Sequence, residues 1–369
     1  MARTSFGIAC FNFGLNRLEV IQMTGQEYVQ KLTSCLNSFP SIRNVEIEWD
    51  VGFDSSVDFL CGPIEEGSSF SPPVLAANVR LDIYIPFRMQ AELLGTDIDY
   101  LETYTEMFRV RKVCGYFYSV TFIEPLTPTS ESDPSQGVRI VRDFLKKLFE
   151  SPSAEPFTFE VLGPSPFHAK CYIQPGVSSK NASIIAERIS SRGYDSVLFT
   201  YDPDAFFDEE ELKDELFEEA SDELALYYAK IDTNNIQQDN WHIILGQVND
   251  LTKANNMPWW RRIPMMLLGH SRRLYAAHSS VTEFEMERLY TQYLMQRDYL
   301  SVYSDRKHPF FQTFIDRIFE DEFKYPAADV IRLIDFSESR RIQSVQILFL
   351  LFAALLGGVV GSLVTLLVK

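Results

Sequence analysis

Three aspartates that follow a predicted strand are the first residues with a chemistry of their own. Asp202, Asp204 and Asp208 come directly after the apolar run Ser196–Tyr201. Carboxylate oxygens are the ligands that Mg²⁺ prefers, and the end of a strand is a common place for a ligand site. The same residues also suit a turn and a helix start, since Asp-Pro-Asp favours a turn and acids complement the dipole at a helix N-terminus. The sequence leaves both interpretations open, a metal site and a capped helix start.

Two arginines near a second predicted strand suggest an anion site. Arg109 and Arg111 precede Cys114–Ile123, an apolar run that is expected to form one strand. Side chains alternate along a strand, so both would lie on one face and could bind an anionic ligand together. A solvated strand edge is the other interpretation.

The segment Met257–Leu274 combines aromatic rings with positive charge, because it has four arginines and no acid. Rings beside cations suit contact with lipid headgroups or stacking on a nucleotide-like ligand. They also suit docking of an acidic helix, for which Asp202–Glu223 is the internal partner. The residues expected to make such contacts are Trp259, Trp260, Arg261 and Arg262.

His168 and Lys170 form an H-x-K pair on a predicted strand. The pair resembles half of the phospholipase D signature, in which the histidine is the nucleophile and the lysine binds phosphate. The resemblance covers only these two residues: the aspartate of the signature would fall on Pro175, and the chain has no second H-x-K. It implies a membrane-tethered hydrolase of a phosphate-containing substrate, although that chemistry needs a second histidine to protonate the leaving group. A structural or ligand-contacting histidine is the other interpretation.

Several common catalytic motifs are missing from the sequence. There is no Walker A loop, no G-x-G-x-x-G, no G-x-S-x-G, no H-E-x-x-H and no kinase signature. This argues against a P-loop nucleotidase and a dinucleotide oxidoreductase, and favours a protein that is not an enzyme. No cofactor is indicated.

Charge and cysteine content argue against one class of partner and one class of fold. The formal charge is −17, of which Asp202–Glu223 contributes −11 and the remainder −6. Non-specific binding to nucleic acid requires basic surface, so an acidic body argues against it. The five cysteines are widely spaced and form no C-x-x-C pair, which argues against a disulfide framework.

The elements that would position these residues change character along the chain. Strands are expected within residues 1–203, together with a helix opened by the capping box Thr24–Glu27 and helices over Val138–Glu150 and Ser179–Arg192. After residue 203 helical periodicity dominates. A second capping box, Ser280–Glu283, is expected to open a helix that runs to about Tyr303, and shorter helices are expected over Pro309–Phe323 and Ala327–Phe336. We therefore expect an α+β fold: a mixed or antiparallel sheet domain with flanking helices over 1–203, an α-helical bundle or stalk over 204–339, and a transmembrane helix over 345–368.

The last of these segments, Ile347–Val368, carries no charge. As a helix it would span about 33 Å, close to the roughly 30 Å hydrocarbon core of a bilayer. Arg340 and Arg341 precede it and only Lys369 follows, so the bulk of the chain is expected to be cytoplasmic. The membrane would be the bacterial inner membrane, or the segment would be a tail anchor in a eukaryote.

Small residues in this segment suggest a self-associating helix. Gly357 and Gly361 form a G-x-x-x-G pair continued by Thr365, and Gly358 and Ser362 lie on an adjacent stripe. Such spacing lets two helices approach closely in lipid. A homo-oligomer is therefore expected.

The order of parts favours a single-pass cytoplasmic sensor or effector that binds a ligand or protein partner and acts at the membrane by self-association. The layout resembles the cytoplasmic funnel of CorA-type channels and single-pass membrane effectors of bacterial defence. The chain lacks the second membrane helix and the G-M-N turn of CorA proteins. A membrane-tethered hydrolase and a constitutive membrane adaptor are the alternatives.

Overall fold

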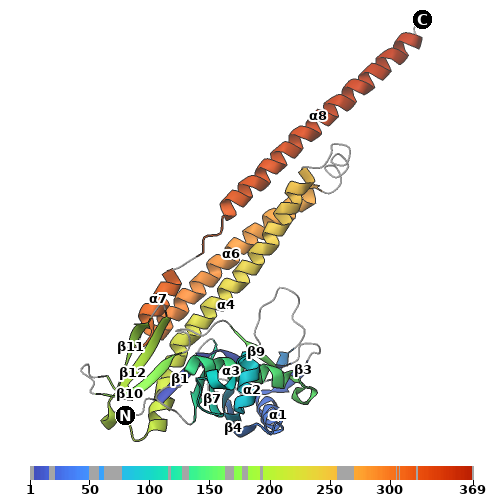
Figure 1. Ribbon diagram of the computed structural model, residues 1–369. Coiled ribbons are helices and arrows are strands. Elements are labelled where there is room, and N and C mark those ends of the chain that lie inside the picture. Colours follow the sequence, from blue (N-terminus) through green and yellow to red (C-terminus); the bar gives the residue numbers. More distant parts are fainter. Residues whose placement is uncertain are drawn as a thin grey trace. The chain divides into compact units, whose positions relative to one another are not determined.

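The fold is taken from a computed structural model (Figure 1). It describes residues 4–15, 21–49, 58–61, 77–114, 118–126, 133–162, 170–176, 182–191, 194–255, 270–304, 306, 308–320 and 323–367. The chain divides into two compact units. The first, called the sheet unit, comprises Met1–Thr233 and Met295–Asp321, and the second, called the helical unit, comprises Asn234–Leu294 and Glu322–Lys369.

The sheet unit is built on an eight-stranded mixed sheet in the order β11-β12-β10-β1-β8-β7-β6-β4. Its neighbours pair antiparallel except β10 and β12, which are parallel. The strands are β1 (Thr4–Ala9), β4 (Ile42–Trp49), β6 (Ala77–Tyr84), β7 (Met107–Cys114), β8 (Ser119–Pro125), β10 (Cys171–Pro175), β11 (Ile184–Ser191) and β12 (Tyr194–Tyr201). Two further pairs are β2 (Phe11–Leu15) with β9 (Phe157–Val161), and β3 (Ile21–Thr24) with β5 (Asp58–Cys61). The predicted α+β fold class is confirmed.

Three helices cover one face of this sheet, namely α1 (Gly25–Asn37), α2 (Phe87–Leu94) and α3 (Pro134–Phe149). The predicted capping box is present, because Glu27 N–H donates to Thr24 Oγ1 and Thr24 N–H donates to the Glu27 carboxylate. Alternate residues of β6 and β7 point into this first core, among them Leu81, Ile83, Phe108 and Val110. The residues between them therefore face the other side of the sheet.

The other face is covered within the sheet unit by the first turns of α4 (Glu209–Asn255) and by α7 (Gln312–Glu320). Phe217 of α4 stacks on Phe122 of β8 with ring centroids 4.2 Å apart, and its edge meets Phe6 of β1 at 5.0 Å. All three rings are at most 1% exposed. This second core fixes the start of α4 against the sheet.

The helical unit packs parts of α4, α6 (His270–Tyr303) and α8 (Ala327–Leu367) around its own core. Trp241 of α4 lies 5.3 Å from Phe284 of α6, and Tyr325, just before α8, lies 5.0 Å from Phe284 between ring centroids. Val330 and Ile334 of α8 are buried in the same cluster. The helices α4 and α6 thus contribute residues to both units.

In the described part of the chain, α8 is the one helix that is long and apolar enough to cross a membrane. None of its most apolar stretch is buried. The segment expected as a separate helix, Ala327–Phe336, is continuous with it. By length and composition, α8 could therefore span a bilayer.

Two local predictions within the sheet unit were wrong. Ser179–Arg192 was expected to be helical, but its described part forms strand β11, where the β-branched residues Ile184, Ile185 and Ile189 suit a sheet. Cys114–Ile123 was expected to be one strand, but Cys114 ends β7 and pairs with Ser119 at the start of β8. Short 3₁₀ helices occur at Ile98–Tyr100, Pro152–Ala154 and Pro203–Ala205.

Candidate functional site

The predicted arginine pair lies on the face of the sheet that α4 covers. Since Phe108 and Val110 of β7 point into the first core, Arg109 and Arg111 point to the opposite side. Arg109 pairs across the strands with Asp82 of β6, with 2.9 Å between its Nε and Asp82 Oδ1. Burial alone would raise the pKa of Asp82, but hydrogen bonds from Arg109 and Asn44 outweigh that effect and lower it.

Acidic residues of α4 neutralise a second cross-strand pair on the same face of the sheet, which consists of two arginines. Arg80 and Arg111 are opposite each other in neighbouring strands, an arrangement that is destabilising for like charges on their own. Glu210 Oε2 lies 2.8 Å from Arg80 Nη2 and also pairs with Arg111 Nη2. Arg111 has further partners in Asp214 and in Glu124, whose Oε1 lies 3.1 Å from its Nε.

Lys213 of α4 completes this network from the helix side. Its Nζ lies 2.9 Å from Glu124 Oε2 and 3.0 Å from Glu209 Oε1. Burial would lower the pKa of Lys213, but Glu124 and Glu209 outweigh it and raise the pKa. The network therefore docks the acidic start of α4 on the sheet. In the structure, the partners of Arg109 and Arg111 are carboxylates of the chain itself. Binding of an external ligand by these two arginines therefore stays a prediction.

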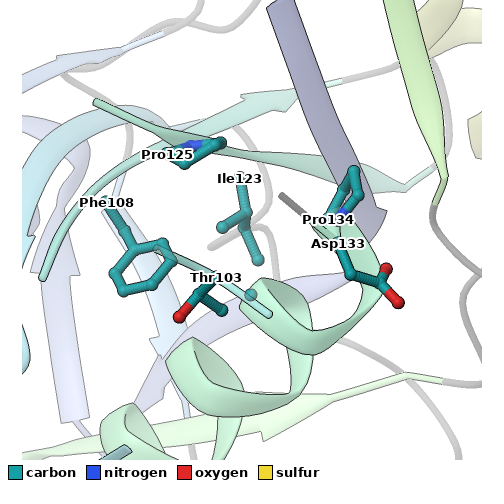
Figure 2. A pocket seen from close by; sticks show the side chains of 7 residues that line it. Thr103, Phe108, Ile123, Pro125, Asp133 and Pro134 are labelled. Carbon is teal, nitrogen blue, oxygen red and sulfur yellow. The ribbon is translucent and has the colours of Figure 1, made fainter. Parts of the chain in front are cut away.

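Lys170, one half of the H-x-K pair, is used to hold the start of α3. Its Nζ lies 3.0 Å from Asp133 Oδ2, and Asp133 also accepts a hydrogen bond from Ser135 N–H at 2.9 Å. The cavity beside Asp133 has a volume of about 10 Å³, enough for one water molecule and no substrate. Figure 2 shows the side chains that line it, including Thr103, Phe108, Ile123, Pro125, Asp133 and Pro134. His168 lies outside the described residues.

The three aspartates considered for a metal site lie at turns and helix starts. Asp202 accepts a hydrogen bond from Asp204 N–H at 3.1 Å. Asp208 accepts from Glu210 N–H at 2.9 Å and from Glu211 N–H at 2.8 Å, at the start of α4. Within the described ranges, no group of three or more His, Cys, Asp or Glu side chains is arranged to hold a metal ion.

The remaining predicted residues divide between described and undescribed parts. Trp259, Trp260, Arg261 and Arg262 lie outside the described residues. The small residues expected to mediate self-association all lie in α8, namely Gly357, Gly358, Gly361, Ser362 and Thr365. A Cβ added to Gly357 or Gly358 would meet nothing within 4 Å in the single chain.

A larger groove, which the sequence did not indicate, lies between β11 and α7 within the sheet unit. Its volume is about 590 Å³, within the range of ordinary ligand pockets. No acidic residue occurs among the described residues that line it. These are Ala186, Arg188, Phe310, Phe311, Thr313, Phe314 and Arg317.

One end of the groove is apolar. Behind the lining, the buried ring of Phe199 of β12 contacts Phe310 and Phe311, with ring centroids 5.6 and 6.0 Å apart. Ala186 is the register partner of Phe199 on the neighbouring strand β11. This end can therefore take an aliphatic or aromatic group.

The other end is basic. The Arg188 guanidinium lies over the ring of Phe314, 5.4 Å from its centroid. Burial, and then the charge of Arg317, lower the pKa of Arg188. An anion bound beside both guanidinium groups would relieve this repulsion, because its charge is opposite to theirs.

A buried glutamate of α4 holds the wall of the groove in place. Glu223 is fully buried, and its carboxylate accepts hydrogen bonds from the backbone N–H groups of Phe310 and Phe311, both at 2.8 Å. Tyr303 Oη and Arg306 Nη1 donate to the same carboxylate at 3.0 and 3.2 Å. Burial raises the pKa of Glu223, although these hydrogen bonds act in the opposite direction.

Sequence reasoning missed Arg188 and Arg317. Arg188 was missed because Ser179–Arg192 was expected to be a helix. Arg317 lies in a helix that was expected over Pro309–Phe323, but no element was predicted to pack against that helix. The signal that could have found them is the alternation of Ile184, Ala186 and Arg188 as a strand pattern.

No family model, no curated protein and no solved structure matches the chain. The function is therefore argued from the geometry alone.

Proposed function

We propose that the chain is a membrane-anchored sensor or effector whose sheet unit binds an anionic ligand in the groove between β11 and α7. The observation that carries the proposal is that Arg188 and Arg317 line one groove together with aromatic rings, with no acid among the described lining residues. Charge-assisted hydrogen bonds from a planar guanidinium group to an anion are roughly twice as strong as hydrogen bonds between neutral groups.

The membrane part of the proposal is supported by α8. Its apolar stretch is long enough to span a bilayer. In the proposed orientation the bulk of the chain is cytoplasmic. The membrane is the inner membrane of a bacterium, or α8 is a tail anchor in a eukaryote. Contacts between the small residues of α8 would produce a homo-oligomer. Because α4 and α6 contribute to both units, ligand binding at the groove has a continuous helical route toward the helical unit.

The groove is tested by replacing Arg317, which is exposed. We expect full-length protein in detergent to bind inorganic pyrophosphate by isothermal titration calorimetry, and Arg317→Gln to weaken binding about tenfold or more, since it removes a charged hydrogen-bond donor. Arg139→Gln is the control, because Arg139 is an exposed arginine of α3 in the same unit. Saturable binding that is unchanged by Arg317→Gln, or no saturable binding, would refute the proposal.

The same preparation separates a sensor from an adaptor. A sensor should change its oligomeric state in analytical ultracentrifugation when pyrophosphate saturates the groove. A constitutive adaptor should not.

A further inference from the structure

We infer that the natural ligand of the groove is an extended acidic peptide segment of another protein, which pairs with β11 as an additional strand of the sheet. This inference rests on the proposed function, in which the groove binds an anion, and names the class of ligand. Two features support it independently: the position of β11 at the end of the sheet, and the chemistry of the groove beside it.

The backbone of β11 is arranged to receive another strand. In the described sheet β11 is an end strand, with β12 on one side only. Asp202 N–H donates to Ser183 C=O at 3.0 Å, so Ser183 directs its backbone groups toward β12. Hydrogen-bonded and non-hydrogen-bonded pairs alternate along an antiparallel ladder. Ile184 and Ala186, one and three residues further along, therefore direct their N–H and C=O groups away from β12, which is the template that an added strand requires.

The groove lies at the outer margin of the sheet, beside this edge. Its described lining comes from β11, from α7 and from Phe310 and Phe311 just before α7, and it includes no residue of β12. Thr313 and Phe314 share one face of α7 with Arg317, which follows them by four and three residues within the helix. A strand added to β11 would thus present every second side chain to this helix face.

The two ends of the groove specify the order of side chains in the peptide. Ala186 and Phe310 mark the apolar end, while Arg188 and Arg317 mark the basic end. Ala186 and Arg188 are two residues apart, and neighbouring strands place facing side chains at the same interval. The preferred peptide therefore has an apolar residue and an acidic residue separated by one position. A small anion would fill only the basic end.

The inference is tested with synthetic peptides and full-length protein in detergent. The probe is a rhodamine-labelled, threonine-rich peptide in which leucine and aspartate are separated by one residue, and the measurement is fluorescence anisotropy. A peptide of the same composition with leucine and aspartate adjacent should bind about tenfold more weakly or worse, since one of the two side chains then points away from α7. A peptide with N-methyl groups on alternate residues should also bind about tenfold more weakly or worse, because it cannot form the main-chain ladder.

A backbone variant tests strand addition from the side of the protein. Ala186→Pro removes an N–H that points away from β12, so it leaves the β11–β12 ladder intact. We expect it to weaken peptide binding by about tenfold. Circular dichroism and a thermal melt establish that this variant is folded, and the N-methylated peptide tests the same point without altering the protein.

The outcomes distinguish this inference from the proposed function. If pyrophosphate binds and Arg317→Gln weakens it, but the peptides bind equally or are insensitive to N-methylation, strand addition is wrong and the anion groove stands. If neither pyrophosphate nor any peptide binds saturably, the proposed function fails as well.

Discussion

At the scale of the residue, arginine side chains have different surroundings in two parts of the sheet unit. Arg111 has a side chain that is 6% exposed and is surrounded by the carboxylates of Glu124, Glu210 and Asp214. Arg317 is exposed on a groove with no acid among its described lining residues. An external anion would have to displace a buried network from Arg111, whereas it would relieve repulsion at Arg317. The surrounding charges thus favour the groove, rather than the pair Arg109 and Arg111, as the site for an external anion.

The buried network predicts how stability depends on pH. The folded-state pKa of Asp82 lies below its ordinary value of 3.8, because hydrogen bonds from Arg109 and Asn44 outweigh the effect of burial. The stabilisation is therefore present above pH 3.8 and is lost as the pH falls through the lowered folded-state value. We expect Asp82→Asn to lower the free energy of unfolding by about 2–3 kcal/mol at pH 7.

This difference should disappear in strong acid, where the wild-type carboxyl is also protonated. Urea unfolding of both proteins at a series of pH values measures it. Glu92→Gln serves as control, since the Glu92 side chain is 68% exposed. A difference that is constant down to the acid limit would show that the charge of Asp82 contributes nothing.

At the scale of the element, local signals determined how much of the fold could be predicted. The capping box at Thr24 and the amphipathic pattern that includes Leu145 are short-range, and α1 and α3 form as expected. The strand β11 was predicted as a helix because its pairing with β12 depends on tertiary contacts. Ser280 was expected to cap a helix but lies inside α6, which begins at His270. The groove depends on both β11 and α7, so a wrong assignment of one strand concealed the site.

The wall of the groove predicts a second stability effect. Glu223→Gln replaces one carboxylate oxygen by an NH₂ donor among donors from Phe310, Phe311, Tyr303 and Arg306. Glutamine relieves the cost of a buried charge but leaves buried N–H groups unpaired, and the second effect should be larger. We expect a loss of about 1–3 kcal/mol in urea unfolding.

A matched variant on the same helix identifies the cause. Glu215→Gln alters an exposed glutamate of α4 and should change stability by less than about 0.5 kcal/mol. Because Glu223 positions Phe310 and Phe311, its variant should also weaken pyrophosphate binding. Unchanged stability together with unchanged binding would exclude Glu223 as the support of the groove.

At the scale of the whole molecule, the chain joins the unit that carries the proposed anion groove to a helix that could enter a membrane. The sheet unit has its own cores, and the helical unit has a separate one. In the helical unit, Val330 and Ile334 fix the first part of α8 by burial, and the apolar stretch that follows is exposed. Packing within one chain therefore leaves this stretch to lipid or to a second copy.

Substitution of a small residue in α8 tests whether a second copy covers this stretch. A Cβ added at Gly357 meets nothing within 4 Å in the single chain, so Gly357→Leu should not change the stability of the monomer. If two α8 helices pack through this stripe, the leucine side chain prevents the close approach of their backbones. We expect self-association in phosphatidylcholine vesicles to weaken about tenfold, measured by energy transfer between labelled copies.

Gly246→Leu is the matched control, because Gly246 is an exposed glycine of α4 with nothing within 4 Å of its added Cβ. Both variants should resist extraction from the vesicles with alkaline carbonate, since neither changes the length of the apolar stretch. Equal energy transfer in Gly357→Leu and wild type would contradict self-association through this face. Extraction of the wild type would contradict membrane insertion itself, because a spanning helix is held by the transfer of its whole apolar surface out of water.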